Sequence, residues 1–398
     1  MFEAILHSPD TYVEKYGKFI EKVKKEGFIL DDDQDEYHLA MEAYKESTLP
    51  STYKLMILPT YGCNLSCWYC LQDHRHVSMS EETVRRTKLH IRNYLTSNKI
   101  KNFTLSWFGG EPLTKYDIVV DISSYAKALC KELGIIFQNC ITTNSLLLNK
   151  IRIAQLNECG VNVYQITLDG TREEHNKVKS LPNKDTFSIA LNNIVDILTV
   201  SPKTYVILRI NYSARMKNPR SVIDEIGEII PIHLRDRIVL DVQKVWQEGA
   251  NLRKDEGYID LATYAGKCQF HPDVYHCGKC YADNLHFHEI LPNGTVDVCE
   301  HEGLDVVGRA ELAENGEIKW KEQLPCFQYS IIKENIKCNK CKHMPICGGP
   351  CPAKRNFIYK DGNANAYPCL YQDMDEEMNQ NIKNLHDAVL SCHTKTNE

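Results

Sequence analysis

Cysteine is the residue type in this chain with the greatest capacity for chemistry, and there are 17 of them. Cys63, Cys67 and Cys70 form a tight CX3CX2C group. Three thiolates at this spacing can converge on one inorganic centre, one donor short of the usual four. Two interpretations follow. The trio ligates a four-iron cube whose last iron stays open to a small molecule, or it forms a zinc site completed by His74 or His76.

The elements that must position this trio show a regular rhythm from about residue 53. Short β-rich runs alternate with amphipathic helical segments, and this alternation predicts parallel strands joined by helical crossovers. Six such units are too few for a closed eight-unit barrel, so the pattern favours an open partial barrel or a doubly wound sheet. The predicted strands are 54–58, 102–107, 135–142, 161–168, 204–211 and 237–242. The predicted helices lie near 84–95, 115–133, 146–158, 184–199 and 219–229, the first after a capping box from Ser78 to Glu81.

Further polar motifs follow the ends of successive predicted strands, where parallel sheets carry their chemistry. Gly109-Gly110-Glu111-Pro112 follows the second strand; its glycines let backbone approach a ligand, and its carboxylate can accept an ammonium hydrogen bond. An ordinary turn explains it equally well. Thr142-Thr143-Asn144-Ser145 follows the third strand, and Thr167-Leu168-Asp169-Gly170 with His175 follows the fourth. The fifth strand carries Arg209 and Asn211.

A second group of cysteines occupies the C-terminal part. Cys280, Gly294 and Cys299 form CX13GX4C, in which Pro292-Asn293-Gly294 predicts a hairpin turn between two strands. Cys338, Cys341, Cys347 and Cys351 form CX2CX5CX3C, and Cys369 follows. Spacing alone suits structural zinc and a ferredoxin-type cluster equally.

The CX3CX2C group with Tyr69 before its last cysteine resembles the radical S-adenosylmethionine (SAM) superfamily. The resemblance implies a partial (β/α)6 TIM-like barrel, with a 4Fe-4S cluster on Cys63, Cys67 and Cys70. The open iron of that cluster would bind SAM, whose reductive cleavage yields a 5′-deoxyadenosyl radical. Tyr69 would lie near the adenine. The implied SAM-binding residues are Tyr69, Gly109, Gly110, Glu111, Asn144, Ser145, Thr167, Asp169, Arg209 and Asn211.

Two of these assignments carry a reservation. Ser145 stands where the family has glycine, which bears on the local backbone geometry. Arg209 and Asn211 match an R-x-N position that can face the cofactor in relatives, although a structural salt bridge explains an inward arginine equally well.

The C-terminal array resembles the SPASM domain of radical SAM enzymes that act on peptides and proteins. By that resemblance Cys338, Cys341, Cys347 and Cys369 bind one auxiliary 4Fe-4S cluster, and Cys280, Cys299 and Cys351 bind another. The fourth ligand of the latter is expected to be Cys277, with Cys268 or a substrate-open site as alternatives. Glu300 stands where anaerobic sulfatase maturases have a catalytic Asp. A solvated surface role explains Glu300 equally well.

Length, composition and charge set the outer limits. The 398 residues are 43% hydrophobic and 25% charged, with a net charge of −6, which fits a globular protein and disfavours nucleic acid and acidic membranes as partners. No apolar run is long enough for a membrane helix and the N-terminus lacks a signal peptide, so we expect a cytoplasmic protein. The expected domains are an appendage at 1–50, a radical SAM core at 51–250, and a SPASM domain at 251–398. The appendage either helps bind a leader peptide or is an independently folding charged helix.

Together these features predict a radical SAM/SPASM peptide maturase that installs a crosslink or thioether in a ribosomally made precursor peptide. The alternative within the class is an anaerobic sulfatase-maturating enzyme that forms formylglycine. The alternative from another class is a non-catalytic iron-sulfur or zinc module. A flavodoxin or ferredoxin is the expected reductant.

Overall fold

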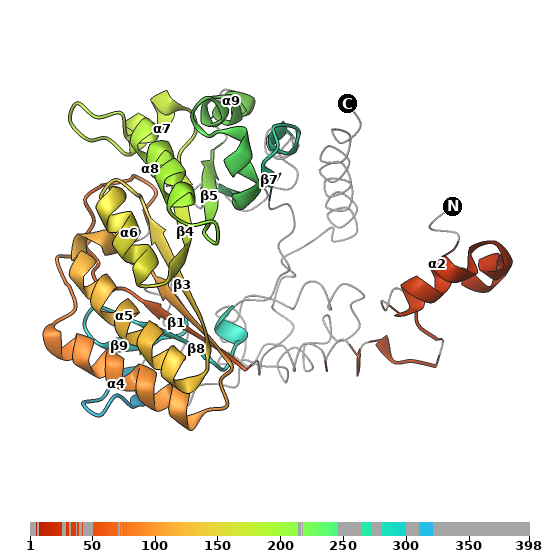
Figure 1. Ribbon diagram of the computed structural model, residues 1–398, viewed down its shortest axis with the longest axis horizontal. Coiled ribbons are helices and arrows are strands. Elements are labelled where there is room, and N and C mark those ends of the chain that lie inside the picture. The colour runs from red at the N-terminus through yellow and green to blue at the C-terminus, as the bar shows by residue number, and fades with distance from the viewer. Residues whose placement is uncertain are drawn as a thin grey trace, which may run out of the picture.

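The computed structural model describes residues 8–25, 51–70, 74–213, 218–245, 264–272, 281–299 and 310–320, together with positions 5, 29–31, 33–36, 38, 39, 42, 72, 216 and 261. These residues form one sheet of eleven strands in the order β11-β10-β9-β8-β1-β2-β3-β4-β5-β6-β7. The middle of this sheet is the predicted alternating segment (Figure 1).

Six strands pair in parallel in the order in which they occur in the chain. They are β1 Thr52–Ile57, β2 Asn102–Trp107, β3 Ile136–Thr143, β4 Val161–Leu168, β5 Tyr205–Tyr212 and β6 Ile238–Lys244. A doubly wound sheet reverses its strand order at a switch point, whereas these six strands never do. The fold is therefore a singly wound partial barrel, and the (β/α)6 expectation is confirmed.

Helices connect these strands and lie together on one side of the sheet in Figure 1. They are α4 Glu81–Ser97, α5 Tyr116–Leu133, α6 Lys150–Glu158, α7 Arg172–Val178, α8 Thr186–Val200 and α9 Pro219–Ile229. Short 3-10 helices, η2 Pro112–Lys115 and η3 Ile232–Arg237, precede α5 and β6.

The predicted capping box at Ser78 is wrong. The N-cap of α4 is Ser80, whose side chain accepts from the Thr83 backbone N–H. Ser78 instead forms a β-bridge with Thr60 and exchanges a hydroxyl hydrogen bond of 2.9 Å with its side chain. Both serines carry the hydroxyl that an N-cap needs. Because Ser78 is engaged in the bridge with Thr60, Ser80 caps the helix.

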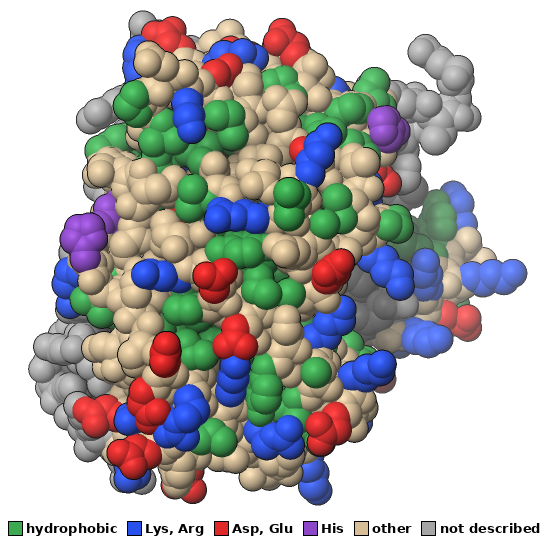
Figure 2. Space-filling view, turned by 60° about the vertical axis from the view of Figure 1, so that its left-hand side comes forward, with side chains coloured by type: hydrophobic (Ala, Val, Ile, Leu, Met, Phe, Trp, Pro, Cys, Tyr) green, Lys and Arg blue, Asp and Glu red, His purple; other side chains and the backbone are tan. Residues whose placement is uncertain are grey.

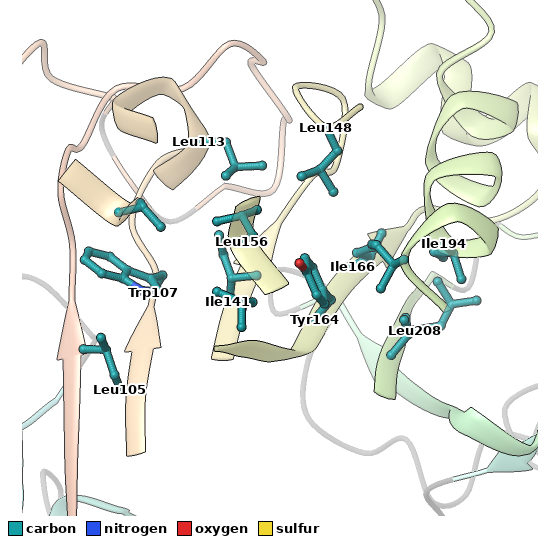
Figure 3. Close-up of a cluster of buried hydrophobic side chains, with 14 of the residues drawn as sticks. Leu105, Trp107, Leu113, Ile141, Leu148, Leu156, Tyr164, Ile166, Ile194 and Leu208 are labelled. Carbon is teal, nitrogen blue, oxygen red and sulfur yellow. The ribbon is translucent and has the colours of Figure 1, made fainter. Parts of the chain in front are cut away.

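The main core lies between the helices and the strands (Figure 3). Alternate residues of each strand are buried against the helices, as the iBiBiB pattern of β2 illustrates. Trp107 at the end of β2 is 1% exposed, and its indole N–H donates to the Ser123 hydroxyl on α5 at 3.0 Å. The other face of the strands is less buried and more polar; its residues include Thr104, Ser106 and Gln165.

Strands from the C-terminal part extend the same sheet at both ends. β8 Phe287–Ile290 pairs in parallel with β1, so Lys54 lies opposite Phe287. β9 Thr295–Asp297, β10 Ala310–Leu312 and β11 Ile318–Trp320 follow antiparallel, and the two-residue β7 His271–Pro272 pairs with β6. The 3-10 helix η6 Tyr281–Asp283 precedes β8. The predicted hairpin turn joins β8 to β9, and Gly294 supplies its positive φ of 83°.

The N-terminal part forms η1 Pro9–Tyr12 and α2 Val13–Lys25, which lie apart from the sheet in Figure 1. Ile20 of α2 is buried with Ile5 and Ile29 in a separate small cluster. Across the main body in Figure 2, side chains of Lys and Arg are interspersed with those of Asp and Glu. None of the helices in the described part of the chain has the length and apolar character needed to cross a bilayer.

Candidate functional site

The three clustered cysteines lie on the loop that follows β1, at the carboxyl edge of the parallel strands. Cys63 and Cys67 are half-buried and Cys70 is exposed. Burial raises the pKa of the Cys63 thiol to about 11, and the charges of Glu111, Cys67 and Cys70 add to this rise. The Leu65 N–H donates to the Cys63 sulfur at 3.4 Å. We name residues 61–70 the cysteine loop.

The paired glycines after β2 make room for the cysteine loop. A Cβ on Gly110 would overlap the carbonyl oxygens of Tyr61 and Gly62, and one on Gly109 would overlap that of Thr60. Gly110 N–H donates to the Thr60 carbonyl at 3.1 Å, and Glu111 N–H donates to the Gly62 carbonyl at 2.9 Å. The close backbone approach expected from these glycines is therefore made to the chain itself, and it fixes the start of the cysteine loop.

The carboxylate of Glu111 is buried and joins the loops after β2 and β3. Oε1 accepts from the Leu113 N–H at 3.0 Å and the Thr143 hydroxyl at 2.8 Å, and Oε2 accepts from the Asn144 N–H at 2.8 Å. Burial raises the pKa of Glu111 to about 7, although these donors oppose the rise. The side chain thus holds the two loops together.

Asn144 connects the loop after β3 to the cysteines. Its amide donates to Asn64 Oδ1 at 2.8 Å and lies 3.9 Å from the Cys63 sulfur. Ser145, beside it, has a φ of 65° and is fully buried, and its hydroxyl has no hydrogen-bond partner among the described residues. The backbone of Ser145 lies in the left-handed region, which disfavours side chains. This explains why the family has glycine at the position of Ser145.

The residues after β4 meet the cysteine loop at Asp169. Oδ1 of Asp169 accepts from the Tyr69 hydroxyl at 2.6 Å and from Asn211 Nδ2 at 2.9 Å. Oδ2 accepts from the ammonium of Lys179 at 2.5 Å, and the same ammonium donates to the Thr167 carbonyl at 2.9 Å. Burial is the largest single influence and raises the pKa of Asp169, but the charges of Lys179 and His175 together with the hydrogen bonds from Lys179 and Tyr69 outweigh it, and the net shift is downward. The carboxylate therefore stays ionised.

Gly170 and His175 complete the turn after β4. Gly170 has a φ of 91°, and a Cβ there would overlap the Glu174 carboxylate that closes the capping box of α7. His175 is fully buried and accepts from the Asp169 backbone N–H at 3.3 Å through Nδ1. Burial lowers the pKa of His175 to about 3, so the imidazole is neutral.

Arg209 lies on the same face of β5 as Asn211, which contacts Asp169. It stands opposite Thr167 on β4 and Asp241 on β6 in the strand register. The guanidinium is half-buried and forms no hydrogen bond or ion pair with any residue that the structure describes. The salt bridge considered as its alternative role is therefore not found among those residues.

The donor set fits an iron-sulfur cluster better than a single zinc ion. No group of three His, Cys, Asp or Glu side chains within the described ranges is arranged to hold one metal ion. The Nε2 atom of His74 lies 3.1 Å from the Cys70 sulfur, which is hydrogen-bond distance. Three thiols on one loop are the ligand type that iron-sulfur clusters use, so the residues present fit such a cluster.

Most of the expected auxiliary site lies outside the described residues: Cys277, Cys280, Glu300, Cys338, Cys341, Cys347, Cys351 and Cys369. Cys299 is described and half-buried, two residues after β9. Cys268 lies near β7, at the opposite end of the strand order, and packs against the main core.

Sequence reasoning missed Lys179 and Asn64. Lys179 follows His175 by four residues, so a helix after the Leu168-Asp169-Gly170 turn would bring it back toward the strand end. That helix, α7, is only seven residues long and was not predicted. Asn64 carries no signal apart from its place beside Cys63.

Residues 57–210 match the family model of the Radical SAM superfamily. Among curated proteins the chain is 30% identical to the uncharacterized protein MJ0804 of Methanocaldococcus jannaschii, over 51% of this chain and 61% of that protein. It is 26% identical to Fe-coproporphyrin III synthase of Methanosarcina barkeri, over 34% of this chain and 31% of the relative. The chain thus spans about three fifths or less of the length of these relatives.

Two solved structures share the fold over most of their length. Native anSMEcpe with bound AdoMet and Cp18Cys peptide has a TM-score of 0.59 and 15% identity, covering 86% of this chain and 100% of that one. Streptococcus suis SuiB bound to precursor peptide SuiA has a TM-score of 0.55 and 16% identity, covering 92% of this chain and 89% of that one. The described residues therefore share the fold of these two structures.

Proposed function

We propose that this chain is a radical SAM enzyme that modifies a peptide or protein, installing a crosslink or thioether in a ribosomally made precursor. The observation that carries this proposal is the position of the cysteine loop. It lies at the carboxyl edge of a partial barrel and is held there by the motifs after β2, β3 and β4. Electron supply would come from a flavodoxin or ferredoxin, in a reducing, cytoplasmic compartment.

Cys63, Cys67 and Cys70 would hold the 4Fe-4S cluster in this proposal. With SAM bound, the cluster supplies a 5′-deoxyadenosyl radical that abstracts a hydrogen atom from the substrate. Asn144 and Tyr69 keep the cysteine loop against the strand ends through the 2.8 Å and 2.6 Å hydrogen bonds described above. Arg209, without a described partner, is available to a carboxylate on that face. The other expected SAM contacts, namely Gly109, Gly110, Glu111, Ser145, Thr167, Asp169 and Asn211, remain proposals.

The proposed peptide substrate is supported by two relatives in fold, since both anSMEcpe and SuiB have been solved with a bound peptide. The division into an appendage at 1–50, a core at 51–250 and a SPASM domain with two auxiliary clusters at 251–398 belongs to the same proposal. Glu300 would be its catalytic residue.

Formylglycine formation by an anaerobic sulfatase-maturating enzyme is the second candidate. It is favoured by the coverage of the whole anSMEcpe chain by this one. The two candidates differ in their product. A crosslink and the oxidation of Ser to an aldehyde both remove two hydrogens, but only formylglycine formation leaves an aldehyde. Labelling with an aldehyde-reactive hydrazide therefore separates the two when candidate peptides are incubated with the enzyme. A non-catalytic iron-sulfur or zinc module is disfavoured because a radical SAM domain implies catalysis.

Anaerobic purification with iron and sulfide analysis tests the proposal. Three cubes require about twelve irons per chain. The triple variant Cys63→Ala, Cys67→Ala, Cys70→Ala should lose about four irons and stop cleaving SAM to 5′-deoxyadenosine. Cys130→Ala, which removes a buried thiol in α5, is the matched control and should keep both properties. Unchanged SAM cleavage in the triple variant would refute the assignment.

His74→Ala separates an open cube from a four-donor metal site. If His74 only hydrogen-bonds to the Cys70 sulfur, the variant keeps its iron and its SAM cleavage. If His74 is a fourth ligand, metal content falls and the radical SAM assignment of the trio fails. His76→Ala tests the other candidate donor in the same way, and His233→Ala, at an exposed histidine away from the cysteine loop, is the control.

A further inference from the structure

Three side chains from separate parts of the chain meet at the carboxylate of Asp169. Tyr69 comes from the cysteine loop, Asn211 from β5, and Lys179 from the residue just after α7. Asp169 itself directly follows β4. Because Tyr69 lies between Cys67 and Cys70, its hydroxyl ties the middle of the CX3CX2C segment to the barrel.

The ion pair at the centre of this meeting point is buried. Asp169 is 7% exposed and Lys179 is 3% exposed. Two charges removed from water are tolerated only when they compensate each other and satisfy their remaining hydrogen-bonding groups. Here the ammonium donates one hydrogen bond to the Asp169 carboxylate and another to the Thr167 carbonyl. Lys179 is therefore bonded to the end of β4 through two acceptors.

Lys179 is also placed rigidly. Its backbone N–H donates to the His175 carbonyl at 2.7 Å and ends α7. Asn176 in α7 accepts from the Thr186 hydroxyl at 2.8 Å and from the Phe187 N–H at 2.9 Å, which fixes α7 to the start of α8. The ammonium therefore reaches Asp169 from a backbone that is held on the scaffold.

We propose that Lys179 is a positioning residue for the cysteine loop, acting through Asp169 on the hydroxyl of Tyr69. The paired carboxylate keeps one oxygen on Lys179 and presents the other to Tyr69 and Asn211. Without the ammonium, a buried carboxylate seeks other donors or a proton, and its geometry toward Tyr69 is lost. This inference rests on the proposed function only in that the positioned loop is the one that would bind the cluster.

The chain offers a matched control for the charge. Lys177 lies on α7 two residues before Lys179 and forms an i,i+4 pair with Glu173 at 2.5 Å. Both partners of that pair are exposed, with 70% and 79% of their side chains accessible. Lys177→Met thus removes the same charge two residues earlier in the chain without touching Asp169.

Hydrogen exchange of the metal-free, full-length chain, kept anaerobic and reduced, measures the position of the loop without any cofactor. We expect Lys179→Met and Tyr69→Phe each to speed exchange of the amides of residues 66–70 about tenfold, the order expected for one lost charge-assisted hydrogen bond. The double variant should exchange no faster than either single variant, because both act through one carboxylate. Lys177→Met should match the wild type, and Lys179→Arg should restore most of the protection.

Protection of residues 66–70 that is unchanged in Lys179→Met, or effects that add in the double variant, would overturn the inference. If Lys179→Met does not fold, Lys179→Gln replaces it in the same cycle, since its amide keeps an N–H for Asp169 without the buried charge. A wild-type chain that binds no iron would instead count against the proposed function, and the exchange result would stand by itself.

Discussion

The left-handed backbone at Ser145 carries a side chain where only glycine is free of strain. Ser145→Gly should raise the free energy of unfolding by about 1 kcal/mol, because it relieves the positive φ and removes a buried hydroxyl without a described partner. Urea denaturation of the metal-free chain measures the change. Ser145→Ala keeps the strain and serves as the comparison, so a glycine variant no more stable than the alanine variant would contradict this explanation.

Glu111 should make stability fall as the pH rises. Its folded pKa of about 7 lies above its unfolded value, so the folded state holds a proton that the unfolded state has released. The folded chain therefore loses stability from the unfolded pKa up to about pH 7, and the loss is complete above that pH. Chemical denaturation of the wild type and Glu111→Gln from pH 5 to 8 should show the variant gaining relative stability toward pH 7. Parallel pH profiles would contradict the prediction.

For single residues, the sequence predicted which side chains belong to the site better than it predicted the hydrogen bonds between them. Spacing picks out the cysteine trio, Gly109-Gly110, Asp169 and Asn211, because short motifs at strand ends are local signals. The bond from Tyr69 to Asp169 spans 100 residues and depends on side-chain rotamers, so it leaves no local pattern. Tyr69 is expected near the adenine from the family resemblance, and the structure adds that its hydroxyl is engaged by Asp169.

The loops after β1 and β2 approach each other closely beside the site. Gly110→Ala should displace the cysteine loop and cost about 2–3 kcal/mol, because the new methyl group meets backbone atoms that cannot rotate away. Because the displaced loop carries the three cysteines, the iron content of the variant after anaerobic reconstitution should also fall. Gly17→Ala is the control, since Gly17 lies in α2 with nothing within 4 Å of an added Cβ and without a positive φ. Full iron loading of Gly110→Ala would show that the loop tolerates the shift.

The sequence predicted the individual strands better than it predicted their order in the sheet. The predicted strands match β1 to β6 within two residues, because alternating burial leaves a clear period of two. Periodicity does not reveal strand order, so partial barrel and doubly wound sheet stayed open until the parallel pairings were seen. The short helix α7 escaped because seven residues give too little periodicity.

At the scale of the molecule, α4 joins the six parallel strands to the β10–β11 hairpin. His90 Nδ1 contacts the Gly316 carbonyl at 3.0 Å and its Nε2 contacts the Tyr53 hydroxyl at 2.7 Å. Asn93 donates to the Asn315 carbonyl at 2.8 Å and Arg86 to the Leu312 carbonyl at 3.4 Å. The side chains of α4 thus bind successive carbonyl groups of this hairpin.

His90→Ala should loosen that attachment. The variant loses two hydrogen bonds and a buried ring, so we expect the free energy of unfolding to fall by about 2–4 kcal/mol. Hydrogen exchange should rise in residues 310–320. Arg92→Ala, which alters an exposed residue of the same helix, should change stability by about 0.5 kcal/mol or less. Exchange in the hairpin that is equal in both variants would contradict this role for His90.

The pairing of β8 with β1 has a consequence for synthesis of the chain. One edge of β1 stays without its neighbour until residues 287–290 leave the ribosome, more than 200 residues after β1 itself. At translation speeds of about 5–20 residues per second, the gap lasts roughly ten to fifty seconds. During that interval the nascent sheet presents a bare edge on which a chaperone could act and through which neighbouring chains could aggregate.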